Sequence, residues 1–128
     1  MYSHMMVGSN DLEKSKTFYD ALFSAIGGKE GVVDSKGRLF YSHNGAFFLV
    51  TKPINGEAAS VSNGATIGFA MADPAQADAW HTAGEAAGGT AIEDPPGWRG
   101  NDFGRLYLAY LRDPDGNKLC ALHREASE

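Results

Sequence analysis

Cysteine is nearly absent from this chain of 128 residues, which contains Cys120 and no other thiol. A single cysteine cannot form an internal disulfide, and chains without disulfides are typical of a reducing compartment, so we expect a cytoplasmic protein. The first residues also lack a basic stretch followed by an apolar one, and we therefore expect no secretory signal.

Long apolar runs and an excess of positive charge are missing as well. The longest uncharged apolar run, residues 46–50, is far too short to cross a bilayer. The net charge of -5 disfavours a nucleic-acid partner, because phosphate binding needs a concentrated basic surface. With 43% hydrophobic and 21% charged residues, the composition is that of a soluble globular domain. We expect a small-molecule ligand, no nucleic acid and no membrane.

The pattern that organises the chain lies near its C-terminal end. Residues 106–111 and 119–122 are two apolar runs, and residues 113–117 between them have the sequence Asp-Pro-Asp-Gly-Asn. Proline presets φ, Asp and Asn bond their own backbone, and glycine adopts a positive φ without steric cost. This combination predicts a β-hairpin.

The first half of the chain predicts one helix and four strands. Asn10 is the expected N-cap of a helix near 11–26, with Glu13 completing a capping box. The Gly-Gly pair at 27–28 is expected to end this helix, and the Asn-Gly pair at 44–45 predicts a tight hairpin. Apolar patterning places the strands at or near 2–8, 31–34, 38–42 and 46–51.

The second half repeats this order after a Pro-, Asn- and Gly-containing linker at 53–64. Asp73 is the expected N-cap of a helix near 74–87, with Gln76 completing the box, and a Gly-Gly pair follows at 88–89. The remaining expected segments are strands at 65–72 and near 90–93, a loop at 95–103, and the hairpin described above.

The order βαβββ thus occurs twice, in a first module at about 1–52 and a second at about 65–124. Two copies are too few for a solenoid, but they fit a fold made of paired modules. The length predicts that residues 1–128 form one α+β domain that buries about two-thirds of its unfolded surface.

Three features in this order resemble the vicinal oxygen chelate superfamily, which includes glyoxalases, bleomycin resistance proteins and extradiol dioxygenases. They are His4 in the opening strand, the segment 9–19 and the closing segment 112–117. The resemblance implies an open, curled mixed β-sheet built from the two modules around a cavity, usually in a homodimer.

The resemblance also implies which residues occupy the four metal-ligand positions of the superfamily: His4, Leu49, Thr66 and Cys120. A divalent ion that acts as a Lewis acid needs about three protein ligands, typically imidazole and carboxylate. We therefore expect no metal and no cofactor, with a divalent metal site as the alternative. The other histidines are expected on the surface or at strand ends, with His81 on the solvated face of its helix.

Alternation along two strands predicts a hollow. Small side chains share one face of each, while bulky Val7, Ile67 and Phe69 share the other. This pattern suits a sheet with helices behind it and a cavity in front. The alternative is that partner strands fill the space with Phe48 or Tyr107. The small-residue face comprises His4, Met6 and Gly8 in the first strand, and Thr66, Gly68 and Ala70 in the second.

The loop at 95–103 supplies two further candidates. Trp98 offers a flat apolar surface, and a solvent-facing Arg99 can hold a carboxylate or phosphate through two parallel hydrogen bonds. A Trp98 wedged onto the core is the alternative. Cys120 has no evident base beside it, so we expect a buried small residue. The expected ligand-binding residues are His4, Thr66, Trp98, Arg99, Tyr107 and Cys120, with His4 or a tyrosine as the acid–base group.

Three classes of function remain open from the sequence. The first is a metal-independent superfamily enzyme that acts on a small carbonyl compound or conjugate. The second is a drug- or metabolite-sequestering dimer of the bleomycin resistance type. The third is a metal-dependent lyase similar to lactoylglutathione lyase, and the missing carboxylates argue against it.

Overall fold

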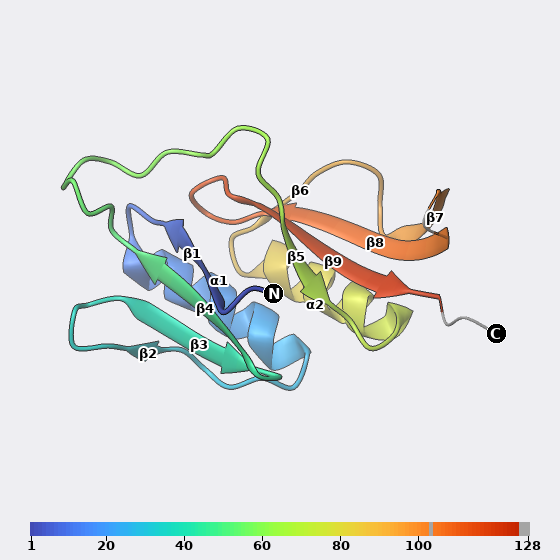
Figure 1. Cartoon of the computed structure of the whole chain (residues 1–128), viewed down its shortest axis with the longest axis horizontal. Coiled ribbons are helices and arrows are strands. Elements are labelled where there is room, and N and C mark those ends of the chain that lie inside the picture. The colour runs from blue at the N-terminus through green and yellow to red at the C-terminus, as the bar shows by residue number, and fades with distance from the viewer. Residues whose placement is uncertain (103, 126–128) are drawn as a thin grey trace.

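A computed structural model describes residues 1–102 and 104–125, and of Asn101 only the backbone. Phe103, at the end of the expected loop, and residues 126–128 lie outside the described part. The expected α+β class is confirmed, with two helices behind two mixed sheets (Figure 1). The first half of the chain forms β1 (His4–Gly8), α1 (Leu12–Ala25), β2 (Val32–Val33), β3 (Leu39–His43) and β4 (Ala46–Thr51).

The second half forms a similar set with one additional strand. Its elements are β5 (Ile67–Ala70), α2 (Pro74–Ala86), β6 (Thr90–Ala91), β7 (Gly97–Asn101), β8 (Gly104–Arg112) and β9 (Lys118–Arg124). Residues 52–66 connect the two halves. None of the helices in the described part of the chain is long and apolar enough to cross a membrane.

The strand order is equivalent in the two sheets. It is β1-β4-β3-β2 in the first and β5-β9-β8-β6 in the second, with β7 also paired to β8. The opening strand of each half runs parallel to the closing strand, and the other pairs are antiparallel. The edge strands β1 and β5 therefore face the boundary between the sheets, which we call the seam (Figure 1).

The N-cap of helix α1 lies one residue later than expected, at Asp11 instead of Asn10. The carboxylate of Asp11 accepts hydrogen bonds from the backbone N–H groups of Glu13 and Lys14, both at 3.1 Å. Asn10 exchanges hydrogen bonds with the backbone of Ala59 instead, so the prediction of Asn10 as N-cap is wrong. Both side chains are good caps, and the distant linker determined which of them was used.

Three other local predictions are confirmed by backbone geometry. Asp73 caps α2, because its carboxylate accepts from the backbone N–H of Gln76 at 2.8 Å. Glycines 27 and 88, which follow the two helices, have φ of 81° and 107°. Asn44 and Gly45 both have positive φ, as a type I′ hairpin requires.

One core is shared by the two halves. The helices pack against each other, and a Cβ added to Gly84 of α2 would lie 2.3 Å from Leu111 and 2.9 Å from Leu22. Only glycine permits this approach. The packing also buries His81, which is 7% exposed and lies 3.3 Å from the Glu85 carboxylate, so its expected place on a solvated face is wrong.

Strand β7 replaces most of the loop that was expected at 95–103. It pairs antiparallel with β8, and Arg99 lies opposite Leu106. The Arg99 guanidinium donates hydrogen bonds to the carbonyl oxygens of Leu108 at 2.6 Å and of Asp94 and Pro95 at 2.9 Å. The prediction of a loop with a solvent-facing Arg99 is therefore wrong. A glycine-rich segment without periodicity gives no local signal for a strand whose partner is distant in sequence.

Candidate functional site

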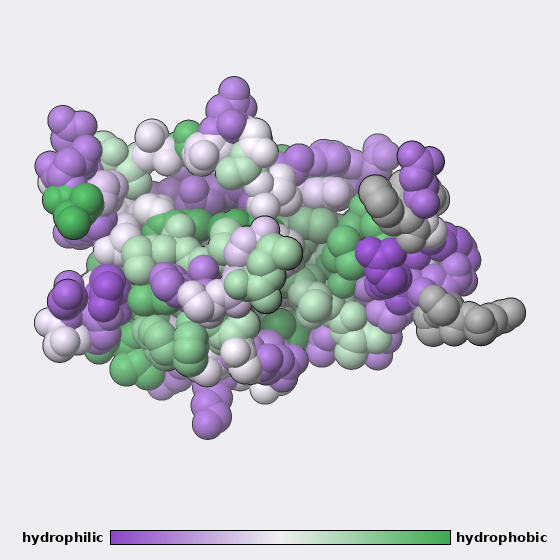
Figure 2. All heavy atoms as spheres, in the orientation of Figure 1, coloured by the Kyte–Doolittle hydropathy of each residue, from purple (hydrophilic) through white to green (hydrophobic). Residues whose placement is uncertain are grey.

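The two sheets have one face toward the helices and one face away from them, which we call the front face. Phe48 contacts the rings of Tyr19 and Phe23 on α1, at centroid distances of 4.9 and 6.2 Å. Neighbouring residues along a strand point in opposite directions, so Phe47 and Leu49 belong to the front face. The view of Figure 2 shows the middle of this face, where apolar surface lies between more hydrophilic edges.

Strand register extends the front face across both sheets. Met6 and Phe40 lie opposite Leu49, and Gly68 and Tyr110 lie opposite Cys120. The face predicted to carry small residues is therefore the one that points away from the helices.

A hollow of about 550 Å³ lies beside the seam, between β1, the end of the linker and the start of β5, and we call it the front hollow. Thr66 lines it, just before β5 begins, and a Cβ built on neighbouring Gly68 would meet no atom within 4 Å. Space is therefore open in front of β5. The hollow is lined by Met5, Met6, Val7, Gly8, Ser60, Val61, Ser62, Gly64, Ala65, Thr66, Ile67, Asn117 and Lys118.

Neither aromatic residue that could have filled this space does so. Phe48 packs on α1, as described above, and the Tyr107 hydroxyl donates to the carboxylate of Asp78 on α2 at 2.6 Å. This hydrogen bond, together with burial, raises the pKa of Tyr107. Because both rings are on the helix side, neither Phe48 nor Tyr107 fills the front face, and Tyr107 lies outside the hollow.

Trp98 is on the same side as Tyr107, its partner across β7 and β8. The two rings meet edge to face at 5.4 Å, and His123 lies 6.0 Å from Trp98. The guanidinium of Arg105 covers the Trp98 ring at 4.4 Å. Trp98 is thus packed on one side and 38% exposed, away from the front hollow.

Arg99 is on the front side, but its donors are already engaged. Three of its N–H groups bond main-chain carbonyl oxygens of Asp94, Pro95 and Leu108. A guanidinium presents five N–H donors in a fixed fork, so these bonds also fix its orientation. The geometry therefore makes Arg99 an anchor of β7 and leaves no free bidentate pair for a carboxylate or phosphate.

Cys120 is buried, as expected, with 5% of its surface exposed. Burial raises the pKa of its thiol, and a hydrogen bond with Tyr110 acts in the opposite direction without cancelling the effect. The thiolate is the nucleophilic and metal-binding form of cysteine. At neutral pH the Cys120 side chain is therefore neutral and unreactive.

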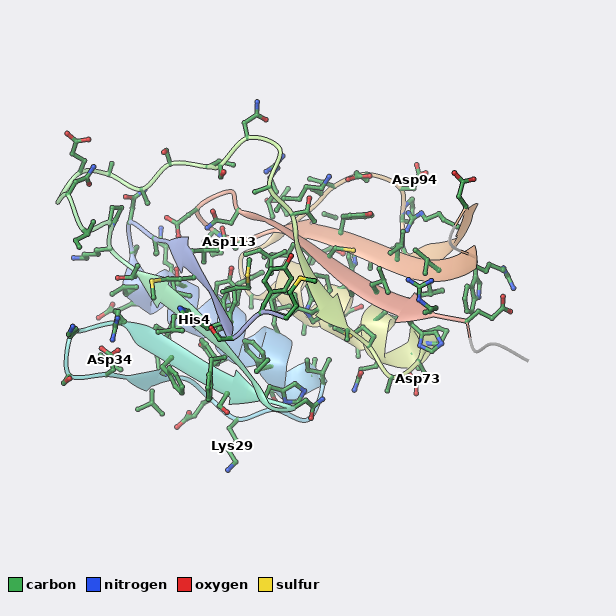
Figure 3. All side chains as sticks on the ribbon, viewed as in Figure 1. His4, Lys29, Asp34, Asp73, Asp94 and Asp113 are labelled. Carbon is green, nitrogen blue, oxygen red and sulfur yellow. The ribbon has the colours of Figure 1, made fainter. Side chains whose placement is uncertain are left out.

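His4 lies at the start of β1 (Figure 3) and is exposed. One ring nitrogen is 2.7 Å from the Ser3 hydroxyl. It does not line the front hollow.

The four ligand positions implied by the resemblance do not form a metal site of the expected kind. They hold an exposed imidazole, an aliphatic side chain, a hydroxyl and a protonated thiol, at His4, Leu49, Thr66 and Cys120. Within the described residues, no three of His, Cys, Asp and Glu come together in a way that could hold an ion. This donor set does not fit a divalent Lewis acid, which prefers imidazole and carboxylate.

The turn at 113–117 has a role that the sequence did not reveal. Asp113, buried and beside β1 in Figure 3, accepts a hydrogen bond of 2.6 Å from the Tyr19 hydroxyl of α1. Asp115 accepts from the backbone N–H of Asn10, and Asn117 donates to the carbonyl oxygen of Gly8. Burial and the Asp113 carboxylate raise the pKa of Tyr19 well above its usual value. The turn fastens the second sheet to the first.

A second cavity, of about 300 Å³, lies at the other end of the seam and is called the rear cavity here. Its residues come from five separate elements, β1, α1, β3, β4 and β5, which explains why no sequence motif indicated it. It is lined by Met5, Phe23, Ile26, Tyr41, His43, Asn44, Ala46, Phe47, Phe48, Ile67, Gly68, Phe69 and Ala70.

The paired βαβββ order and the helices behind the sheets together define an α+β domain of the glyoxalase type. The chain belongs to the Glyoxalase/Bleomycin resistance protein/Dioxygenase superfamily, whose profile matches residues 2–121. No curated protein matches the chain.

Solved structures agree with this assignment. A glyoxalase/bleomycin resistance protein from Albidiferax ferrireducens T118 is 57% identical, with a TM-score of 0.93, and the match covers 97% of this chain and 99% of that one. A lactoylglutathione lyase from Agrobacterium tumefaciens is 22% identical, with a TM-score of 0.67 and coverage of 96% and 92%. The second similarity concerns the fold alone.

Proposed function

We propose that this protein binds a small, largely apolar organic molecule at the front hollow without a metal ion, and that it sequesters the molecule as a homodimer. The observation that carries this proposal is the chemistry of the four superfamily ligand positions. Leu49, Thr66 and a protonated Cys120 occupy three of them, and Thr66 lines a hollow of about 550 Å³. A volume of this size is within the range of small-ligand pockets, about 300–1,000 Å³.

The lining of the hollow supports an uncharged ligand. Met6 and Val61 contribute apolar surface, and Ser60, Ser62 and Thr66 contribute hydroxyl groups. Lys118 is the charged residue of the lining, and its ammonium is paired with the carboxylate of Glu93. A paired charge offers little attraction to an ionic ligand, whereas hydroxyls and thioethers suit a neutral one.

Sequestration is favoured over catalysis because no strong acid or base faces the hollow. His4 contacts Ser3, and the hydroxyl of Tyr110 has a pKa raised by burial and by its neighbour Cys120. General acid–base catalysis works best with groups that titrate near neutral pH. The relative of 57% identity is a glyoxalase/bleomycin resistance protein, a description that includes binding proteins as well as enzymes.

A homodimer would cover the apolar side chains that the front face and its edge leave in solvent. Val32 is 64% exposed, and Phe47 and Met6 are 44% and 39% exposed. Burial of such groups against a second copy removes apolar area from water. Sedimentation equilibrium should give twice the chain mass, and Phe47→Glu should shift the equilibrium toward the monomer. A wild-type monomer at high concentration would contradict this part of the proposal.

The binding proposal is tested by a thermal-shift screen of neutral organic compounds, followed by calorimetric titration of the best one. Thr66→Trp should fill the hollow and weaken binding at least about tenfold. Thr90→Trp is the matched control, because Thr90 is exposed and outside the lining. Equal loss in both variants, or no loss in Thr66→Trp, would contradict the proposed location.

The proposal that the protein works without a metal ion is tested by a separate measurement. Elemental analysis of the purified protein should find no stoichiometric zinc, nickel or iron. One tightly held metal per chain, lost in His4→Ala, would overturn this part of the proposal and favour the lyase-like alternative.

A further inference from the structure

We propose that the rear cavity is a second binding site, which takes a small aromatic molecule carrying one hydrogen-bonding group. This inference does not depend on the function proposed for the front hollow, because the two spaces lie at different ends of the seam and share only Met5 and Ile67 of their linings.

The rear cavity lies at the seam, and strand register places Tyr41, His43 and Phe48 of its lining on the helix side. Tyr41 lies opposite Phe48, and His43 lies opposite Ala46. Phe48 packs on α1, so its cross-strand partner and the residues two positions along each strand point the same way. The end of α1, with Phe23 and Ile26, forms another wall. Met5 and Ile67 line both spaces and separate them.

The lining is chemically suited to an aromatic ligand. Four phenylalanines and one tyrosine surround the space, and the rings of Phe23 and Phe69 already meet edge to face at 5.9 Å. An added ring finds edge-to-face partners in such a wall, and aromatic pairs of this kind stabilise a complex beyond the burial of their surface. A cavity with apolar walls favours an apolar occupant over water.

His43 supplies the polar group. The His43 imidazole meets the Phe23 ring edge to face at 6.1 Å. The imidazole nitrogens form no hydrogen bond with any residue in the described part of the chain. A Cβ at Gly28 would lie 3.2 Å from the His43 Nδ1 atom, so Gly28 leaves room for the imidazole. The hydroxyl of Tyr41, in contrast, is engaged with Asp20 at 2.7 Å. His43 is therefore the hydrogen-bonding group that remains for a ligand.

The equivalent position at the other end of the seam explains why this cavity exists. There the turn at 113–117 crosses the seam and fastens to α1. The turn at 44–45 is shorter, with Asn44 at the mouth of the rear cavity. The fold thus fastens one end of the seam with its own hydrogen bonds, beside the front hollow, and leaves the rear cavity at the other end without such bonds among the described residues.

The test uses naphthol and naphthalene as probes with the full-length protein. Two-dimensional NMR of the wild type should show naphthol shifting the signals of His43, Phe69 and Ile26, while those of Ser62 and Thr66 stay unchanged. Naphthol should bind more tightly than naphthalene by about fivefold, as expected for one hydrogen bond. Absence of binding, or shifts confined to the front hollow, would overturn the proposal.

Two pairs of variants locate the site. Ala46→Leu should fill the rear cavity and weaken naphthol binding at least about tenfold, whereas Ala65→Leu, a matched change in the front hollow, should alter it less than about twofold. His43→Phe should abolish the preference for naphthol over naphthalene while naphthalene still binds. If Ala46→Leu melts far below wild type, Ala70→Leu replaces it, since Ala70 lines the same cavity and is exposed. Wild-type affinity in the filled variant would contradict the proposal.

Discussion

The two halves of the molecule use the final hairpin of each sheet differently. In the second half, Asp113 and Asn117 reach across the seam to the Tyr19 hydroxyl and the Gly8 carbonyl. In the first half, the Asn-Gly turn at 44–45 simply reverses the chain. One end of the seam is consequently fastened by hydrogen bonds, and the other contains a cavity of about 300 Å³.

This difference teaches that a repeated fold does not make a symmetric molecule. Both turns contain residues at positive φ, which are Asn44 and Gly45 in the first half and Gly116 in the second. Only the longer turn also presents carboxylates to the neighbouring sheet. A few extra residues in one turn therefore decide which end of the seam is fastened by hydrogen bonds between the two halves.

The largest loss of stability is expected from removing the Asp113 carboxylate, which links the two halves. Asp113→Ala leaves the buried Tyr19 hydroxyl and the backbone N–H groups of Asp115 and Asn117 without their acceptor. Each unsatisfied buried group costs about 1–3 kcal/mol, so the free energy of unfolding should fall by at least about 3 kcal/mol. Urea denaturation followed by circular dichroism measures this change.

Asn44→Ala is the matched change in the other turn. It should cost only about 1 kcal/mol, from placing alanine at the positive φ of 48°. Equal losses in Asp113→Ala and Asn44→Ala would mean that the two turns contribute alike, and the contrast between the ends of the seam would be wrong.

An intermediate effect is expected at β7, the strand without a counterpart in the first half. Arg99→Ala removes charge-assisted hydrogen bonds to three carbonyl oxygens. Hydrogen bonds to charged groups contribute about 1.5–3 kcal/mol each when buried, and Arg99 is half-buried, so a loss of about 2 kcal/mol is expected. The melting temperature should fall accordingly. A wild-type melting curve would show that β7 does not need this anchor.

A smaller loss of stability, equal in the two halves, is expected at the glycines that end the two helices. Gly27 and Gly88 both end a helix at positive φ, and an added Cβ at either position meets no atom closer than 3.9 Å. Substitution by alanine therefore costs only the backbone strain, about 1 kcal/mol at each site. Differential scanning calorimetry of the two single variants tests this. Losses that differ more than about twofold would indicate that the two helix ends are not equivalent.

The smallest effect concerns acid stability and a residue of the first half. Burial raises the pKa of Asp20, but hydrogen bonds from the Gly31 N–H, Lys16 and Tyr41 outweigh it, so the pKa is lowered. A carboxyl with a lower pKa in the folded state stabilises the fold above its unfolded pKa of about 3.9. That contribution to stability disappears as the pH falls through the pKa that Asp20 has in the folded state.

Because the carboxylate is only partly buried, the contribution should stay below about 1 kcal/mol. Denaturation at pH 6 and pH 3 should therefore show a larger loss for the wild type than for Asp20→Asn. An identical loss in both proteins would remove Asp20 as a source of acid sensitivity.

Much of the fold followed from local chemistry. Capping residues, Gly-Gly pairs and the Asn-Gly signal act within a few residues, and they placed α1 and α2 within one residue of their observed ends. Alternation likewise assigned Ile67 and Phe69 to the helix side, where Phe69 contacts Trp80. The sequence alone also determined that carboxylates are missing from the positions where the superfamily binds metal.

The tertiary structure alone decided how distant segments use these elements. Strand β7 exists because β8 supplies its partner, and the same pairing turns Trp98 toward α2 and ties Arg99 to carbonyl oxygens. The rear cavity exists because α1, β3, β4 and β5 meet around His43 without filling the space. Strand pairing, burial and cavities depend on contacts between residues far apart in the chain, and the pattern of a single segment does not contain that information.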